Sequence, residues 1–295
     1  MILVTGGTGF VGGHVVAALR HAGKQVRCLV RDVRKAEKPE LAGCELAVGD
    51  MTDPASLRAA VEGVERVVHL VAIRQGKAEQ FERIMSQGTR DLVAAAEAAA
   101  VRRFVHMSAL GVDEETKDLV PYYGAKWEME QAVRGSSLPF VIFRPSFVFG
   151  ADGGILPTFR KLAKLAPVTP IAGTGEQRLQ PIWADDVATY FDRALEDDTP
   201  TGTTFELGGP DVVTWNELWA RLKEALGVRR PSIHVPMALM RANAFVTERL
   251  PGNIPLTRDL LKMMQAGDNI VTDDAAAQVF GLSLVPLDDQ LRRAA

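Results

Sequence analysis

The chain begins with Met1-Ile-Leu-Val-Thr-Gly-Gly-Thr-Gly-Phe-Val-Gly12, in which apolar residues run directly into a turn rich in glycine. Ile2 to Val4 is predicted as a strand and Thr5 to Gly9 as a tight turn. A helix is expected next, because Val11, Val15 and Leu19 recur at helical spacing. A strand, a glycine turn and a helix in this order are typical of domains that bind a dinucleotide. The stretch therefore predicts a dinucleotide site.

The glycines of this turn fit two spacings. Gly7, Gly9 and Gly12 fit G-x-G-x-x-G, and Gly6, Gly9 and Gly12 fit the looser G-x-x-G-x-x-G. Such glycines let the chain turn sharply and let backbone N–H groups approach a pyrophosphate, while the helix N-terminus favours its negative charge. A side chain at Gly9 would occupy the space that the pyrophosphate needs and would resist a positive φ there. Glycines also form ordinary tight turns, which is the alternative interpretation.

Composition narrows the class of protein. With 295 residues and 47% hydrophobic residues the chain can bury a large core. Its net charge of -3 and the absence of a basic block argue against a nucleic-acid partner, and no apolar run reaches the length of a membrane span. Cys28 and Cys44 are expected to be buried thiols in a reducing compartment, and the five histidines lack metal-ligand spacing, so no metal site is expected. The strand at the very start leaves no room for a signal peptide, so we expect a cytoplasmic protein.

The second predicted strand, Gln25 to Val30, indicates which cofactor the site selects. An NAD-specific site usually has a carboxylate at the end of this strand, bonded to the ribose 2′-hydroxyl. Here Arg31 follows the strand, with Arg34 and Lys35 close behind. A guanidinium suits a 2′-phosphate, so NADP(H) is favoured. In the alternative interpretation Arg31 is a solvated surface charge, Asp32 holds the ribose and the cofactor is NAD(H).

Strands and helices then alternate along the chain. A strand at Glu45 to Val48 precedes a helix that Pro54 opens after Thr52 or Asp53 as its cap. The strand Arg66 to Val71 precedes a long alanine-rich helix from about Glu79 to Ala100. This alternation predicts an α/β fold, a Rossmann-type doubly wound parallel sheet.

The second informative stretch places three reactive side chains near one another. The strand Phe104 to Met107 delivers Ser108 at its carboxyl end, where ligands bind in open α/β sheets. Pro121 starts a helix in which Tyr122 and Lys126 share a face at i, i+4 spacing. A phenol with a pKa of about 10 is a poor acid–base catalyst, and a nearby ammonium lowers that pKa. Ser108 is placed to hold a substrate oxygen while Tyr122 exchanges its proton. The alternative is a surface helix pair without catalytic function.

At this point the sequence resembles the short-chain dehydrogenase/reductase superfamily, in its extended or atypical branch. The motifs that carry the resemblance are Thr5-Gly-Gly-Thr-Gly-Phe-Val-Gly12, Asp50-Met51, Val68-His-Leu-Val-Ala72, Ser108-Ala-Leu-Gly111, Tyr122-x-x-x-Lys126 and Arg144-Pro-Ser-Phe-Val-Phe-Gly150. Two later pieces, Gln180-Pro-Ile-Trp-Ala-Asp-Asp-Val187 and Pro255-Leu-Thr-Arg-Asp259, are similar to one subgroup. That subgroup comprises bacterial relatives of the dehydrogenase-like accessory subunit of mitochondrial respiratory complex I.

The resemblance implies roles for residues in these motifs. Ser108, Tyr122 and Lys126 form the catalytic set, and Lys126 also bonds the nicotinamide ribose. Tyr123 is a rival for Tyr122, but the family spacing selects Tyr122. The family commonly has an Asn where this chain has Met85, which puts a complete proton relay in doubt. The implied cofactor-binding residues are Gly6, Thr8, Gly9, Phe10, Val11, Gly12, Arg31, Asp50, Met51, Leu70, Val71, Ala72, Tyr122, Lys126 and Pro145.

After the strand Phe140 to Phe143 the composition shifts. We expect residues 1–150 to form the NAD(P)-binding Rossmann domain, with a returning segment near 179–202. Residues 151–178 and 203–295 are expected to form a smaller, mainly helical substrate lobe. Its expected helices include Leu156 to Leu165, Met237 to Val246 and Leu256 to Ala266, and Asp185 and Asp186 are expected to cap a helix from Val187 to Leu195. Met237, Met240, Met263 and Met264 either line an apolar pocket or belong to the core.

Three functions fit these observations. The first is an NADP(H)-dependent oxidoreductase that transfers hydride to or from a small molecule with a carbonyl, an alcohol or a quinone-like ring. The second is a protein that binds NADPH for structure or redox sensing and turns nothing over. The third, a nucleotide-sugar epimerase or dehydratase, would retain NAD, which Arg31 disfavours. Function belongs to the site and not to the fold, so the sequence names neither the substrate nor the oligomeric state.

Overall fold

The computed structural model of the protein describes residues 1–248 and 257–295. Within these residues the chain divides into two compact units. The first consists of Met1–Pro145, Ala184–Leu207 and Asp273–Leu282, and the second consists of Ser146–Trp183, Gly208–Thr272 and Ser283–Ala295. The expectation that the second unit is a substrate lobe stays a prediction.

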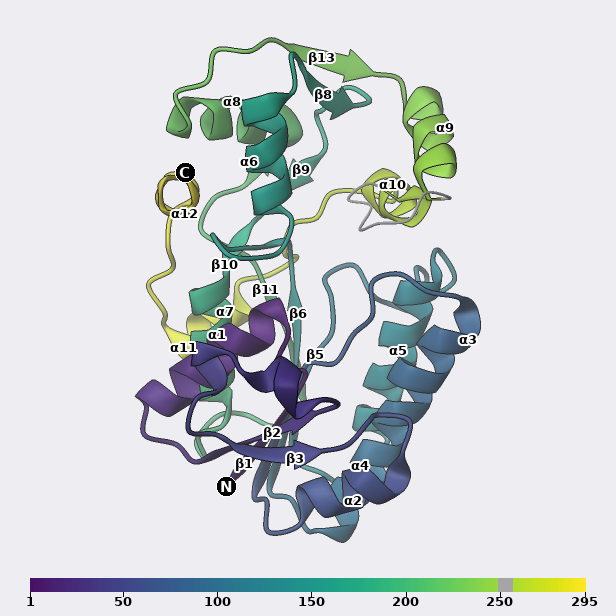
Figure 1. Ribbon diagram of the computed structural model, residues 1–295, viewed down its shortest axis with the longest axis vertical. Helices are drawn as coiled ribbons and strands as arrows, with labels where there is room; N and C mark the ends of the chain where they lie inside the picture. Colours follow the sequence, from purple (N-terminus) through teal and green to yellow (C-terminus); the bar gives the residue numbers. More distant parts are fainter. Residues whose placement is uncertain (249–256) are drawn as a thin grey trace. The chain divides into compact units, whose positions relative to one another are not determined.

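The first unit is built on one parallel sheet (Figure 1). In the described part of the chain this sheet has seven strands in the order β11-β6-β5-β4-β1-β2-β3. Every neighbouring pair is parallel. The strands are β1 (Ile2–Thr5), β2 (Val26–Val30), β3 (Glu45–Val48), β4 (Arg66–His69), β5 (Arg103–Met107), β6 (Phe140–Pro145) and β11 (Thr203–Leu207). The predicted Rossmann-type α/β fold is confirmed.

Helices cover both faces of the sheet. In Figure 1, α1 (Phe10–His21), α7 (Ala184–Ala194) and α11 (Ala275–Phe280) lie on one side, and α2 (Pro54–Val61), α4 (Gly88–Ala98) and α5 (Pro121–Arg134) on the other. Leu3, Val67, Phe104 and Ile142 are fully or almost fully buried in the core between the sheet and the second group of helices. Central strands covered on both faces need such nearly continuous apolar sequences.

Three expected elements differ from the structure. The long helix is interrupted: α3 (Ala78–Phe81) is followed by a π-helical segment, η3 (Glu82–Gln87), before α4 begins. Strand β4 ends at His69, two residues early, because Leu70 and Val71 leave the sheet to pass over the glycine turn. Helix α7 begins at Ala184, so Asp185 and Asp186 lie in its first turn and do not precede it. Asp53 does cap α2, since its carboxylate accepts from the Ala55 amide.

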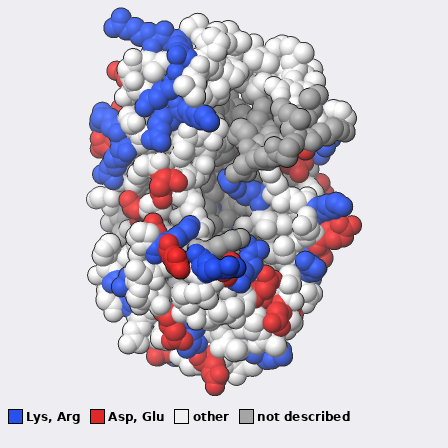
Figure 2. All heavy atoms as spheres, in the orientation of Figure 1, with Lys and Arg blue, Asp and Glu red and all other residues white. Residues whose placement is uncertain are grey.

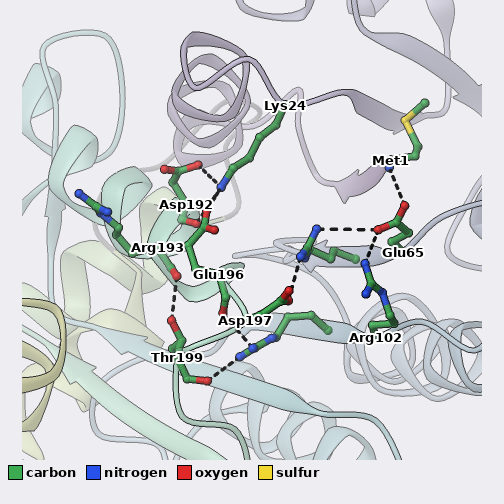
Figure 3. Close-up of polar contacts among 11 residues, drawn as sticks. Met1, Lys24, Glu65, Arg102, Asp192, Arg193, Glu196, Asp197 and Thr199 are labelled. Atoms are coloured by element: carbon green, nitrogen blue, oxygen red, sulfur yellow. Dashed lines mark hydrogen bonds and ion pairs between the residues drawn. The ribbon is translucent and has the colours of Figure 1, made fainter.

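The amino-terminal ends of the strands carry a network of charges (Figure 3). Glu65 lies 3.9 Å from the terminal ammonium of Met1 and 2.6 Å from Arg102. Arg66 pairs with Asp197 at 2.9 Å. The buried Arg103 donates to the carbonyl oxygens of Thr199 and Glu196, both at 2.9 Å. These contacts attach the segment before β11 to the starts of β4 and β5.

The second unit combines helices with small sheets. Its helices are α6 (Leu156–Leu165), α8 (Trp215–Ala225), α9 (Met237–Thr247), α10 (Arg258–Gln265) and α12 (Leu287–Ala294). Three two-stranded sheets join β7 (Val148–Phe149) to β10 (Ile182–Trp183), β9 (Arg178–Leu179) to β12 (Val213–Thr214) and β8 (Thr169–Ala172) to β13 (Ser232–Val235) in the described residues. The start of the expected helix from Leu256, and Pro255 of the quoted motif, lie outside the described residues.

Aromatic and methionine side chains form the core of the second unit. Phe159 packs on Trp215 and Trp219, with ring centroids 5.8 and 4.9 Å away. Met240 forms a separate cluster with Ala244 and Leu261, against which Met237 and Met264 also pack. This packing supports the core interpretation of those methionines. No helix within residues 1–248 or 257–295 is long and apolar enough to cross a membrane.

Candidate active site

The glycine turn is shaped by two of its glycines. Gly6 has φ +78°, and a Cβ there would lie 3.0 Å from the backbone of Leu70 and Val71. A Cβ at Gly12 would lie 2.1 Å from the carbonyl oxygen of Gly6, so α1 and the turn approach each other too closely for any side chain. Gly9 has φ −78°, and the positive φ of this turn is found at Gly6. A Cβ at Gly9 would meet only the Gly6 oxygen, at 3.2 Å.

The start of helix α1 is suited to an anion. Its cap is Gly9, which offers no side-chain acceptor to the free N–H groups, and its first turn contains no acidic residue. The free amides and the helix dipole favour negative charge at this end. Phe10 and Val11 begin the helix, and the Thr8 carbonyl oxygen accepts from the Lys38 ammonium at 2.6 Å. The turn therefore fits the phosphates of a dinucleotide.

The segment that follows β4 runs from this turn to the cluster in which Tyr122 of α5 packs. Leu70 and Val71 pass against Gly6, and the Leu70 amide donates to the Thr5 carbonyl oxygen at 3.1 Å. Further along, Ala72 and Ile73 pack in the apolar cluster that includes Tyr122. The predicted cofactor residues Leu70, Val71 and Ala72 thus border the glycine turn at one end and the Tyr122 side chain at the other.

The residues after β2 bear on cofactor choice. Arg31 is exposed and makes no hydrogen bond or ion pair with the described residues. The Asp32 carboxylate is already used, because it caps the following turn by accepting from the Arg34 amide at 3.0 Å and pairs with the Arg34 side chain. Figure 2 shows Lys and Arg side chains gathered over the segment that follows β2. This arrangement leaves a cation, and not a carboxylate, free to meet the cofactor.

Asp50 and Met51 follow β3 at the same edge of the sheet. The Asp50 carboxylate accepts from the amide and the hydroxyl of Thr52, at 2.8 and 2.7 Å. Burial raises the pKa of this carboxyl, but the hydrogen bonds from Thr52 and the charges of Arg31 and Arg83 hold it below the usual value. Met51 is buried, and its carbonyl oxygen would lie 2.8 Å from a Cβ at Gly88. Helix α4 therefore begins close against Met51.

Ser108 is a buried hydroxyl without a partner. Its side chain is 2% exposed, and its Oγ makes no hydrogen bond within the described residues. The backbone is fixed, since the Ser108 amide donates to the Phe143 carbonyl oxygen at 2.7 Å and the Leu110 amide donates to Pro145 at 3.0 Å. Buried polar groups are normally hydrogen-bonded, so an unpartnered one at the carboxyl end of a strand is a good candidate to meet a ligand.

Helix α5 presents Tyr122 and Lys126 as the spacing predicted. The Lys126 ammonium is buried, lies 5.9 Å from the centroid of the Tyr122 ring and donates to the Met107 carbonyl oxygen at 2.5 Å. Because Met107 immediately precedes Ser108, this hydrogen bond links α5 to the end of β5. Tyr123 faces elsewhere: it is buried, and its hydroxyl donates to the Leu110 carbonyl oxygen at 3.3 Å.

The pKa values of Tyr122 and Lys126 differ from the expected ones. Burial lowers the pKa of Lys126 to about 7, against a smaller opposing effect of Glu130. Burial raises the pKa of the Tyr122 phenol, and the Arg74 charge, not that of Lys126, opposes the rise. The expectation that Lys126 lowers the phenol pKa is therefore not met. At neutral pH the phenol keeps its proton.

Met85 lies beside the tyrosine. It is fully buried in a cluster with Phe81, Ala125 and Met129, against which Tyr122 packs. Its sulfur accepts from the Ile73 amide at 3.4 Å, and its carbonyl oxygen accepts from the Thr89 hydroxyl at 2.6 Å. The residue at this position thus offers the phenol an apolar surface and no amide side chain.

The sequence analysis missed a buried ion cluster beneath the site. Glu130 is fully buried and pairs bidentately with Arg144, both hydrogen bonds being 2.8 Å long, and also with Arg134. The i, i+4 spacing of Lys126, Glu130 and Arg134 was a signal that could have revealed it. A second missed group is His69, whose ring nitrogens lie 2.6 and 2.9 Å from the hydroxyls of Thr5 and Thr89. Burial lowers the pKa of His69 to about 3, so this histidine is neutral.

The fold and these residues define a Rossmann-type nucleotide-binding protein with the Ser, Tyr and Lys set of the short-chain dehydrogenase/reductase and epimerase superfamily. The chain belongs to the NAD(P)H-binding family, whose model matches residues 6–162. The superfamily that the sequence resembles is thereby confirmed, together with the binding of an NAD(P)H-type cofactor.

Individual relatives are consistent with this family. The chain is 28% identical over 249 residues to an NAD(P)H azoreductase of Xenophilus azovorans, covering 84% of this chain and 80% of the relative. It is 26% identical over 297 residues to mitochondrial NADH dehydrogenase (ubiquinone) 1 alpha subcomplex subunit 9 of Arabidopsis thaliana, covering 96% and 73%. The predicted similarity to the complex I accessory subunit is thus confirmed.

A solved structure shows the same fold. The NADPH-dependent quinone oxidoreductase of Escherichia coli, complexed with NADPH, superimposes with a TM-score of 0.80 at 21% identity and covers 99% of this chain and 98% of that one. Homologues and structural neighbours therefore include NAD(P)-dependent oxidoreductases.

Proposed function

We propose that this protein is an NADP(H)-dependent oxidoreductase that transfers hydride to or from the carbonyl or alcohol of a small molecule, including a quinone-like one. The observation that carries the proposal is the unpartnered, buried Ser108 hydroxyl. The residue before it holds the Lys126 ammonium, and Tyr122 shares the helix face of that lysine. A free hydroxyl, a phenol and an ammonium at the edge of the sheet that carries the glycine turn suit carbonyl chemistry.

Each residue has a distinct role in this proposal. The bound cofactor supplies or accepts the hydride. The Ser108 hydroxyl orients the reacting oxygen of the substrate, and Tyr122 exchanges a proton with that oxygen. Because the raised pKa of Tyr122 keeps the phenol protonated at neutral pH, the site favours proton donation and hence reduction. Lys126 holds the nicotinamide ribose. For this contact the Lys126 ammonium has to extend past the Met107 carbonyl oxygen, to which it donates a hydrogen bond.

The proposal includes cofactor choice and the substrate lobe. Arg31, with no partner in the described residues, binds the 2′-phosphate of NADP(H), whereas Asp32 is used by Arg34. Residues 151–178 and 203–295 remain the proposed substrate lobe. The names of the azoreductase and quinone oxidoreductase relatives support aromatic, largely apolar substrates.

A second function, an NADPH-binding protein without turnover, is favoured by two observations. Met85 surrounds the phenol with apolar atoms, and Lys126 donates to a backbone carbonyl instead of acting on the phenol pKa. The relative from the respiratory complex is consistent with this role. The two functions differ in whether Tyr122 is used in a chemical step.

The substitution Tyr122→Phe distinguishes the oxidoreductase from the NADPH-binding protein without turnover. NADPH oxidation is measured with phenanthrenequinone as the probe substrate, and NADPH affinity by nicotinamide fluorescence. We expect kcat to fall by about a hundredfold or more with cofactor affinity unchanged, because the phenol proton is used only in the chemical step.

Tyr123→Phe is the matched control, since Tyr123 is the neighbouring phenol and donates to a backbone carbonyl. It should keep nearly full turnover. Equal activity in the parent and the Tyr122→Phe protein would show that Tyr122 is not used in the chemical step. No NADPH oxidation by the parent would favour the role without turnover.

A further inference from the structure

Arg74 occupies a position next to Tyr122 that the roles above do not use. The segment before it is fixed at both ends: Leu70 and Val71 lie against Gly6, and Ile73 is held by its amide contact with the Met85 sulfur. The Ile73 side chain also packs in the cluster of Met85 and Tyr122. Arg74 follows immediately and is exposed. The residue before Arg74 therefore packs in the same cluster as Tyr122, and Arg74 itself is exposed at this point of the loop.

The charge of Arg74 is not compensated. It forms no hydrogen bond or ion pair with any residue in 1–248 or 257–295. Arg31 shares this state, whereas Arg144 and Arg134 bind Glu130 and Arg90 binds Glu82. The Tyr122 phenol responds to this charge, since Arg74 acts to lower the phenol pKa against the larger effect of burial.

We propose that Arg74 is a specificity-determining residue that binds a carboxylate of the substrate beside Tyr122. The inference rests on the proposed function, because it assumes that the substrate's reacting oxygen meets this phenol. The guanidinium presents a planar pair of N–H donors that matches a carboxylate with two parallel hydrogen bonds. The preferred substrate is thus an aromatic carbonyl compound with an acidic group, in which apolar atoms meet the half-buried Ile73.

The experiment compares two probes of the same shape. Naphthoate and naphthamide are titrated by calorimetry into the full-length protein saturated with NADP+. Because the arginine is exposed, we expect naphthoate to bind about five- to tenfold more tightly than its neutral amide, and this ratio to fall as salt rises. Arg74→Gln should bring the ratio to about one. Arg74→Lys should restore part of it, since a lysine keeps the charge without the planar fork.

Lys77→Gln is the matched control. It removes an equally exposed cation three residues further along the same loop, and it should leave the preference for naphthoate unchanged. Equal affinity of the parent for the two probes would overturn the proposal. So would an equal loss of NADPH affinity in Arg74→Gln, which would assign Arg74 to the cofactor phosphates.

These binding measurements are independent of turnover. If Tyr122→Phe kept full activity while naphthoate binding still depended on Arg74, the catalytic assignment would fail and the carboxylate site would stand. If Tyr122→Phe lost activity while Arg74→Gln bound both probes like the parent, the carboxylate site would fail alone.

Discussion

Arg103 begins β5 at the amino-terminal edge of the sheet, Ser108 follows its last residue at the carboxyl-terminal edge, and both side chains are buried. The Arg103 guanidinium donates to two carbonyl oxygens and lies among ion pairs that join Met1, Glu65, Arg66 and Asp197 (Figure 3). The Ser108 hydroxyl has no partner in the described residues. From Arg103 to Ser108 the chain thus passes from a hydrogen-bonded guanidinium to a hydroxyl without a partner.

This difference suggests that the two edges of the sheet have different roles, one in stability and the other in binding. A buried polar group without a hydrogen bond lowers the stability of the folded protein. Such a group is therefore kept for a reason other than stability. At the carboxyl edge we propose that this reason is a ligand, because the Ser108 hydroxyl is buried there without a partner among the described residues. At the amino edge the charges stabilise the fold. Stability and binding are therefore expected to respond to substitutions at different ends of the strands.

The largest expected difference in the free energy of unfolding is between substitutions of two neighbouring glycines of α1. Gly12→Ala places a Cβ 2.1 Å from the Gly6 carbonyl oxygen, whereas Gly13→Ala meets only the Glu40 side chain, at 3.7 Å. Alanine gains up to about 1 kcal/mol in a helix, but a forced backbone shift costs about 3 kcal/mol. Urea unfolding should show Gly12→Ala less stable by roughly 2 kcal/mol or more and Gly13→Ala equal or more stable.

Gly9→Val tests the difference between stability and binding at a third glycine of the same turn. Its φ of −78° suits a side chain, and a Cβ there meets only the Gly6 oxygen. We expect a protein of nearly parental stability that no longer binds NADPH, because the valine fills the phosphate space. Retained cofactor affinity in this variant would show that the phosphates lie elsewhere.

The fold was largely predictable because periodicity reports which face of an element is buried. Helix Leu156–Leu165 was placed at its observed bounds, since Pro157 and Pro167 mark its ends and its apolar residues recur at helical spacing. The π-helical segment Glu82–Gln87 was not foreseen, because its residues fit an α-helix equally well. The early end of β4 depends on the passage of Leu70 over Gly6, a contact between segments 64 residues apart.

The site was predictable where spacing along one helix decides it and not where several elements meet. The i, i+4 rule placed Tyr122 and Lys126 on one face, as the structure has them. It could not show that the Lys126 ammonium donates to Met107, because that carbonyl belongs to β5. The Lys126 pKa of about 7 likewise arises from burial by the surrounding elements. The catalytic and cofactor roles of these residues remain predictions.

An intermediate effect is expected from the two ends of β5. Arg103→Met removes a buried donor and leaves the carbonyl oxygens of Thr199 and Glu196 unpaired, so we expect unfolding free energy to fall by about 2–3 kcal/mol. Ser108→Ala removes a hydroxyl without a partner and should change stability by less than about 0.5 kcal/mol. Ser108→Ala should lower the rate of turnover more than Arg103→Met does. Urea denaturation and NADPH oxidation of both variants make the comparison.

Arg102→Met is the control for the amino edge. Its guanidinium is exposed and pairs with Glu65, so its loss should cost less than about 1 kcal/mol. A stability loss for Ser108→Ala as large as that for Arg103→Met would contradict the division of tasks, because the hydroxyl would then have a structural partner.

The smallest effect concerns Arg31, an unpaired charge of the carboxyl edge. If it binds the 2′-phosphate, NADPH should bind about ten- to a hundredfold more tightly than NADH, because a guanidinium forms two charge-assisted hydrogen bonds with a phosphate and exposure weakens them. Arg31→Ala should weaken NADPH binding and leave NADH binding nearly unchanged. Higher salt should narrow the preference in the parent and not in the variant.

Arg34→Ala is the matched control, since Arg34 is as exposed as Arg31 but already paired with Asp32. It should alter the preference less than Arg31→Ala does. Fluorescence titration of the parent and both variants with both cofactors is sufficient. Equal losses for NADPH and NADH in Arg31→Ala would mean that Arg31 contacts a part common to both cofactors. Equal affinities in the parent would instead return the ribose to Asp32, whose carboxylate would then have to leave the Arg34 amide that it now caps.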